Sequence, residues 1–140
     1  MTEGFPEGDG GPFPRRPSAD ARSGRRLHVV PGRFAVEHLP HATFPEDDDW
    51  IALVRAPEGL TVVREAPPFA GPELWAGFYG GEDHGLRVPG TPAEIVGPLA
   101  DAGIAVFVAS TYHADLVLVP EHRLKEAAEA LRDAGHRVET

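Results

Sequence analysis

Apolar residues recur at helical spacing near the C-terminal end of the chain. Between residues 121 and 134 they fall at offsets of 0, 3, 4, 7 and 10, which is the pattern of one buried helix face. These positions are Leu124, Ala127, Ala128, Leu131 and Ala134. Pro120 precedes the stretch and Gly135 follows it, and both residues are typical of helix boundaries. The pattern predicts a helix over residues 121–134.

A second helix is predicted from a capping pattern further upstream. Thr91-Pro92-Ala93-Glu94 places a threonine at the cap, a proline at the first helical position and a glutamate at the third. The apolar face that follows is formed by Ile95, Val96, Leu99 and Ala102. Gly103 is expected to end this helix, because glycine readily adopts the left-handed conformation of a helix stop. Pro98 is expected to bend it, because proline lacks a backbone donor.

Short runs of β-branched and apolar residues predict strands around these helices. Ile104–Ala109 and Leu116–Val119 are joined by a polar connection too short for a parallel crossover, so they form an antiparallel hairpin. Leu86–Val88 is expected to precede the first helix and His136–Val138 to follow the second. From Leu86 to Val138, the order is a ferredoxin-like β-α-β-β-α-β unit, with both helices on one face of an antiparallel sheet.

The preceding region is rich in strands and has no clear helical period. Four strands are expected at residues 27–30, 34–38, 50–55 and 60–64, and a further one at 74–79. We therefore divide the chain into a strand-rich half over residues 27–80 and an α+β unit over 81–140. Residues 1–26 show no period and alternate Gly, Pro, Arg and acids, which is typical of a disordered tail.

Composition and charge exclude several classes of function. The chain has a net charge of -9, and the tail contains five arginines and four acids, so residues 27–140 carry about -10. Such a field repels phosphate backbones and anionic membranes, and we expect neither nucleic acid nor membrane as a partner. The absence of cysteine excludes disulfides and thiolate sites. With no apolar leader or spanning run, a cytoplasmic protein is expected.

Two groups of side chains contain the residue types of a metal or catalytic site, and each also has a simpler interpretation. His113 and Asp115, with His84 or Asp83, have the donor types of a zinc site, but a locally hydrogen-bonded histidine explains the same residues. Ser110, His113 and Asp115 contain the groups of a catalytic triad, but they crowd on one hairpin where the required linear geometry is hard to reach. We expect no metal, no cofactor and no catalysis.

Two blocks of sequence have a recognisable pattern. The first block is Leu27-His28-Val29-Val30-Pro31-Gly32-Arg33-Phe34-Ala35-Val36, followed by Leu39-Pro40. The second comprises residues 98–104, 106–107 and 110–119, the last beginning Ser110-Thr111-Tyr112-His113-Ala114-Asp115, and Ala134-Gly135-His136 follows it. These blocks resemble the tandem ACT-like proteins related to the CASTOR arginine sensors, and the resemblance implies an ACT domain over residues 81–140, with a degenerate ACT-like half before it. It also implies binding of an amino acid or similar metabolite without catalysis.

The resemblance also places the ligand site at the loop before the first helix, the strand after it and the hairpin. The matching positions are Val88, Gly90, Thr91, Gly103, Ile104, Ser110, Thr111, Tyr112, His113 and Asp115. The unpaired N–H groups at the start of the helix suit a ligand carboxylate, and Asp115 or Glu82 suits an amino group.

The sequence therefore predicts a non-catalytic regulatory protein that binds an amino acid or related metabolite and forms a homodimer. One alternative is a small ferredoxin-fold α+β enzyme. Another is an ACT-like interaction module that has lost its ligand. This last alternative follows from Pro89 and His113, which stand where the family usually has a threonine and an aspartate.

Overall fold

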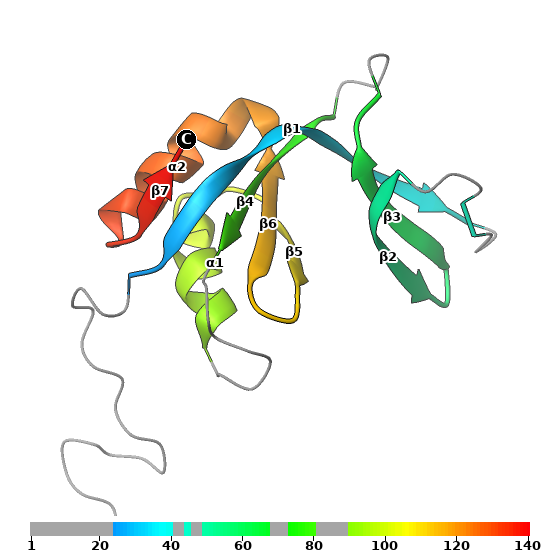
Figure 1. Cartoon of the computed structure of the whole chain (residues 1–140), viewed down its shortest axis with the longest axis horizontal. Coiled ribbons are helices and arrows are strands. Elements are labelled where there is room, and N and C mark those ends of the chain that lie inside the picture. The colour runs from blue at the N-terminus through cyan, green and yellow to red at the C-terminus, as the bar shows by residue number, and fades with distance from the viewer. Residues whose placement is uncertain (1–23, 41–43, 46–48, 68–72, 81–89) are drawn as a thin grey trace, which may run out of the picture.

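A computed structural model describes residues 24–40, 44–45, 49–67, 73–80 and 90–140, and these described residues form one sheet with two helices (Figure 1). The elements in chain order are β1 (Arg26–Leu39), β2 (Trp50–Ala56), β3 (Gly59–Glu65), β4 (Trp75–Gly80), α1 (Thr91–Asp101), β5 (Phe107–Ser110), β6 (Asp115–Pro120), the 3-10 turn η2 (Glu121–Arg123), α2 (Leu124–Asp133) and β7 (Arg137–Glu139). The described residues thus form an α+β architecture, as the sequence predicts.

The strands are arranged around the long strand β1. The sheet order is β2-β3-β1-β4-β6-β5, and β7 pairs with the beginning of β1. Residues 26–28 of β1 pair with β7, which is parallel, and residues 27–30 pair with β4, which is antiparallel, whereas residues 34–39 pair with β3. Figure 1 shows β1 running from the part of the molecule that carries the helices to the β2–β3 hairpin. One strand therefore belongs to both parts.

The prediction of two separate strands at residues 27–30 and 34–38 is wrong, because β1 is continuous over 14 residues. Pro31 and Gly32 read as a turn in the sequence, but they occupy an irregularity in the pairing with β4, between Val30 and Phe34. Gly32 adopts a φ of 93°, which few other residues tolerate. The extra residues are absorbed by a local distortion of the strand, and the chain continues in the same sheet.

Both predicted helices are present, with shifted boundaries. α2 begins at Leu124, because the three residues before it form the tighter turn η2. The predicted strand at Ile104–Ala109 begins only at Phe107. The strand preceding α1 in the described structure is β4, and the predicted strand Leu86–Val88 lies outside the described residues. The predicted unit from Leu86 to Val138 contains no strand from the first part of the chain. In the structure, β1 lies between β7 and β4 in the same sheet.

The main core lies between the helices and one face of the sheet. Along β6, Val117 and Val119 belong to this core, whereas Leu116 and Leu118 face the other side, as strand alternation requires. The fully buried side chains of the core include Leu27, Phe78, Ile95, Leu99, Val117, Val119 and Leu131. Each large aliphatic or aromatic side chain buried in this way contributes roughly 1.5–3 kcal/mol. The middle of each predicted helix face is buried, whereas Ala102 and Ala134, the C-caps of the two helices, are exposed.

A smaller core forms on the opposite face of the sheet. Phe34, Val63, Leu116 and Leu118 are its buried members. Gly77 makes this packing possible, because a Cβ there would lie 3.1 Å from Leu118 Cδ2 and 3.3 Å from Phe34 Cε2. Phe34 of β1 therefore reaches across β4 to the side chains of β6.

Both helices end in the same backbone motif. At the end of α1, Gly103 N–H donates to Ala100 O and Ile104 N–H donates to Leu99 O, each over 2.9 Å. This pair of hydrogen bonds is the Schellman motif, and Gly103 takes the left-handed conformation it needs, with a φ of 73°. α2 ends in the same way at Gly135. Both predicted glycine stops are confirmed.

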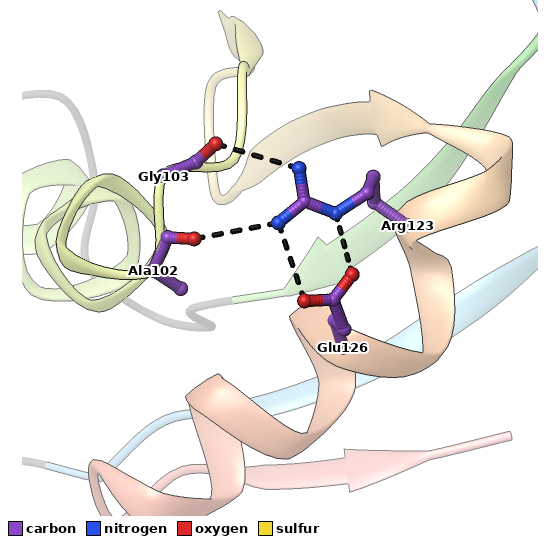
Figure 2. Close-up of polar contacts among 4 residues, drawn as sticks. All are labelled: Ala102, Gly103, Arg123 and Glu126. Atoms are coloured by element: carbon purple, nitrogen blue, oxygen red, sulfur yellow. Dashed lines mark hydrogen bonds and ion pairs between the residues drawn. The ribbon is translucent and has the colours of Figure 1, made fainter.

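Arg123 connects the end of α1 to the first turn of α2 (Figure 2). Its guanidinium donates to Ala102 O over 3.4 Å and to Gly103 O over 3.5 Å. The same group donates to Glu126, with 2.5 Å between Nε and Oε1 and 3.2 Å between Nη2 and Oε2. The positive charge of Arg123 also lies at the C-terminal, negative end of the α1 dipole, where a cation is stabilising. The hydrogen bond from Arg123 lowers the pKa of the Glu126 carboxyl below its ordinary value.

Gly103→Ala is expected to lower the free energy of unfolding by about 1 kcal/mol, because an L side chain disfavours the left-handed conformation. A Cβ at Gly103 would meet no heavy atom within 4 Å, so the loss reflects backbone conformation alone. The matched control is Gly97→Ala inside α1, which also has open space and should raise stability by about 0.5–1 kcal/mol. Urea denaturation measures both changes, and shifts of equal sign would contradict the assigned helix stop.

Glu126→Gln is expected to lower stability at pH 7 and to lose its effect in acid. The folded-state pKa of Glu126 is lowered, so its contribution is present above the unfolded pKa and disappears as the pH falls through the folded pKa. Thermal melts of both proteins between pH 7 and pH 2.5 should therefore converge. The control Glu129→Gln changes an exposed carboxyl on the same helix. A stability difference for Glu126→Gln that persists unchanged in acid would contradict the role given to Arg123.

Candidate functional site

Four strand ends form a row across one end of the sheet. Ser110 pairs with Asp115, Asp115 with Gly80, and Gly80 with Leu27. Leu27 belongs to the core beneath the helices, and strand alternation puts Asp115 on the same face as Val117. The row therefore places the Ser110 and Asp115 side chains on the helix-bearing face of the sheet.

Asp115 is the buried carboxylate of this row. Its side chain is completely buried, and Ser110 Oγ donates to Oδ1 over 2.9 Å. Gly80 beside it has no side chain, and a Cβ there would lie 2.2 Å from Arg26 O. Burying a carboxylate costs free energy that hydrogen bonds must offset, so a buried aspartate at the end of a sheet is a functional candidate.

The connection between β5 and β6 is closed by Thr111. Thr111 N–H donates to Ala114 O over 2.8 Å, and Ala114 N–H donates to Thr111 Oγ1 over 3.0 Å. Tyr79 Oη lies 3.4 Å from the same hydroxyl. Tyr112 is 68% exposed, and its ring meets that of His113 edge to face at 4.8 Å. Thr111 thus holds the hairpin, while Tyr112 and His113 form its exposed tip.

The start of α1 differs from the predicted capping box. Gly90 is the N-cap, with a φ of 86°, and no side chain caps the helix. Glu94 N–H makes the first helical hydrogen bond, to Gly90 O over 3.1 Å. The prediction that Thr91 is the cap is therefore wrong by one residue. Glycine adopts the left-handed conformation of this cap, and the Glu94 carboxylate pairs elsewhere.

The predicted ligand-binding residues divide between two ends of the unit. Gly90 and the segment from Ser110 to Asp115 belong to the end where α1 begins and the β5–β6 hairpin turns. Gly103 and Ile104 follow the other end of α1, whose 11 residues span about 16 Å, and the Ile104 side chain lies in the core. Val88 lies outside the described residues. The structure thus brings together only part of the predicted set.

His136, a buried histidine near the start of α1, belongs to none of the predicted sites. Arg25 N–H donates to His136 Nδ1 over 2.9 Å, so this nitrogen is unprotonated and Nε2 carries the proton. Nε2 then donates to Glu94 O over 2.8 Å. Glu94 is four residues before Pro98, which has no N–H to give to that carbonyl. His136 therefore supplies the hydrogen bond that proline removes from the helix.

Arg25 completes this junction. Its guanidinium pairs with the Glu94 carboxylate, with Nη2 at 2.8 Å and Nε at 2.9 Å from Oε1. Arg137 N–H donates to Arg25 O over 2.8 Å. These bonds join the segment before β1, the first turn of α1 and the start of β7. Pro98 four residues after Glu94 was the only signal in the sequence, and it does not reveal which residue donates.

Two hollows lined by described residues lie away from Asp115. One of about 160 Å³ is at the opposite end of β4 and β6, and one of about 470 Å³ is at the end of β3. The smaller is lined by Glu73, Leu74, Trp75, Pro120 and His122, and the larger by Asp49, Arg64, Glu65, Ala66 and Pro67. Among the described residues, no three His, Asp or Glu side chains are placed to hold a metal ion. Neither helix of the described chain is long and apolar enough to cross a membrane.

Residues 72–133 match the sequence model of the ACT domain family. The match extends from just before β4 to the end of α2, which is less than half of the chain. It thus includes β4 as well as both helices. No curated protein matches the sequence significantly.

Several solved structures are similar to this chain. A protein from Agrobacterium tumefaciens is 22% identical, with a TM-score of 0.69 over 82% of this chain and 92% of that chain. A Vibrio cholerae protein of unknown function, described as a possible transport protein, is 24% identical, with a TM-score of 0.64 over 75% of this chain and 85% of that chain. The ligand-free regulatory subunit of aspartate kinase from Thermus thermophilus is 11% identical, with a TM-score of 0.55 over 77% of this chain and 95% of that chain. Together with the family match, these likenesses show an ACT-like α+β fold with a strand-rich sheet.

His136→Ala is expected to lower the free energy of unfolding by about 1–3 kcal/mol, because Arg25 N–H and Glu94 O, which are partly buried, lose their hydrogen-bonding partner. Pro98→Ala restores an N–H four residues after Glu94, so the cost of His136→Ala should be about 1 kcal/mol smaller in that background. Urea denaturation of the four proteins of this double-mutant cycle measures the difference. His113→Ala, at the exposed hairpin tip, is the control and should change stability little. An equal cost in both backgrounds would show that His136 does not serve the Glu94 carbonyl.

Proposed function

We propose that this protein is a non-catalytic regulatory protein that binds an amino acid or a related metabolite at the end of the sheet where α1 begins. The observation that carries the proposal is the buried Asp115 carboxylate, which lies between Gly80 and Ser110 in the row of strand ends. A homodimer is part of the same proposal.

The carboxylate and the amino group of an amino acid each have a complementary group at the end of the sheet where α1 begins. The first N–H groups of α1 receive no side-chain cap, and the helix dipole puts partial positive charge on them. They suit the ligand carboxylate. Asp115 suits the amino group, because a carboxylate accepts charge-assisted hydrogen bonds from it. The Glu94 carboxylate in the first turn is neutralised by Arg25, so it does not oppose an anion there.

The comparisons support a regulatory role of this kind. The matched family is the ACT domain, and one structural neighbour is by its name a regulatory subunit. We extend the likeness to the tandem proteins of the CASTOR type, with residues 27–80 as a degenerate first half and 81–140 as the ACT domain. In this arrangement the first half contributes β1 to the sheet on which the site lies.

The proposed site takes in only part of the predicted residues. Ser110 and Thr111 hold Asp115 and the hairpin in place, and Gly90 leaves the start of α1 open. The exposed Tyr112 and His113 are available to the variable part of a ligand. Gly103 and Ile104, at the far end of α1, are assigned to the helix stop and the core instead.

A thermal-shift screen against the twenty amino acids tests this function. Saturable stabilisation by one of them is expected, since a ligand at 100 times its dissociation constant adds about 2.7 kcal/mol. Asp115→Asn should abolish the shift while changing the melting temperature without ligand little, because asparagine keeps the shape and can still accept the hydrogen bond from Ser110. The control Asp101→Asn changes an exposed acid at the far end of α1 and should keep the shift.

The outcomes separate the proposed function from its alternatives. A shift that survives in Asp115→Asn would place the ligand elsewhere, and the hollow beside Trp75 would then be examined by Trp75→Ala. The absence of a shift with every amino acid would contradict amino-acid sensing and favour an interaction module.

A further inference from the structure

The described sheet has three outer strands, and only one of them is long. β7 has three residues, of which Arg137 and Glu139 are charged, and β5 has four. β2 has seven residues, and no described strand pairs with its outer side. An outer strand presents a row of backbone donors and acceptors to any strand that approaches, and natural proteins usually protect such edges. β5 and β7 are protected by their short length, and β7 also by its charged residues. β2 is too long to be protected in this way.

The side chains of β2 also lack the usual protection. The sequence of the strand is WIALVRA, in which Arg55 is the only charge and proline is absent. Ile51 is 45% exposed and Val54 is 51% exposed. The one irregularity is the shift in pairing between Trp50 and Ala52, so the strand is regular from Ala52 onward. A regular apolar edge of this kind is a surface for strand pairing.

We propose that the outer side of β2 pairs with β2 of a second copy of this chain, in antiparallel orientation about a two-fold axis. A two-fold interface brings the same patch of both copies together, so the apolar middle of one strand meets the apolar middle of the other. Asp49 stands just before the strand and Arg55 near its end. Antiparallel pairing therefore places opposite charges near each other at both ends, whereas parallel pairing would place like charges together.

The overall charge of the chain favours this specific pairing over unspecific association. The net charge of -9 makes two copies repel each other at most orientations. β2 itself contains one arginine and no acidic residue, so the paired strands add nothing to this repulsion. This inference names the surface of the proposed homodimer. It does not depend on a ligand, and it is tested without one.

The oligomeric state of the full chain tests the pairing. Light scattering coupled to size exclusion is expected to give twice the chain mass of 15.0 kDa. Val54→Lys introduces a charge on the outer strand and should give the monomer mass, with an unchanged circular dichroism spectrum because the position is exposed. Val54→Thr is the matched control, since threonine keeps the branched shape without charge, and it should remain dimeric. A monomeric wild type at all concentrations, or a dimer of Val54→Lys, would overturn the proposal.

A second experiment locates the contact directly. The chain has no cysteine, so Val54→Cys creates a single reactive site. A short bismaleimide is expected to convert this variant into covalent dimers. The control Tyr112→Cys lies at the exposed hairpin tip and should remain monomeric on a denaturing gel. Equal cross-linking of both variants, or none of Val54→Cys, counts against pairing through β2.

Discussion

The pairing of the first residues of β1 between β7 and β4 is the constraint on which the rest of the structure depends. It is possible because Gly80 lets the β1 backbone come close: a Cβ at Gly80 would lie 2.2 Å from Arg26 O. Leu27 then sits between Gly80 and Val138 and is fully buried beneath the helices. Because β1 continues to Leu39, the same strand also holds β3 and, through it, β2. Without this pairing, only the Phe34–Trp75 pair would connect the β2–β3 hairpin to the helical part through the sheet.

The polar contacts of the helical part follow from this placement. Once β1 lies next to β7, Arg25 comes close to His136 and to the first turn of α1. His136 then satisfies the Glu94 carbonyl that Pro98 leaves without its helical donor. A proline inside a helix usually weakens it, but here a tertiary hydrogen bond replaces the missing one. The start of α1, which is part of the proposed site, is therefore held by residues far away in the chain.

The polar groups at the end of α1 and those at its start have different roles. At one end, Arg123 holds the last carbonyls of α1 and the first turn of α2, which is a purely structural contact (Figure 2). At the other end, the Asp115 carboxylate is buried beside a glycine, and the first N–H groups of α1 have no side-chain cap. Polar groups serve stability at the first end, whereas at the second the arrangement suits a ligand with both an amino and a carboxylate group.

The sequence by itself determined the two helices, their glycine stops and the β5–β6 hairpin, because these features depend on side-chain spacing within a few residues. It also pointed to Ser110 and Asp115, which are five residues apart and hydrogen-bonded to each other. Only the tertiary structure decided that β1 is continuous and lies between β7 and β4, that Gly90 caps α1, and that Gly103 and Ile104 lie far from the hairpin. The bond from Arg25 to His136 spans 111 residues of sequence. Such contacts arise from strand pairing and packing of the whole chain, and no local pattern encodes them.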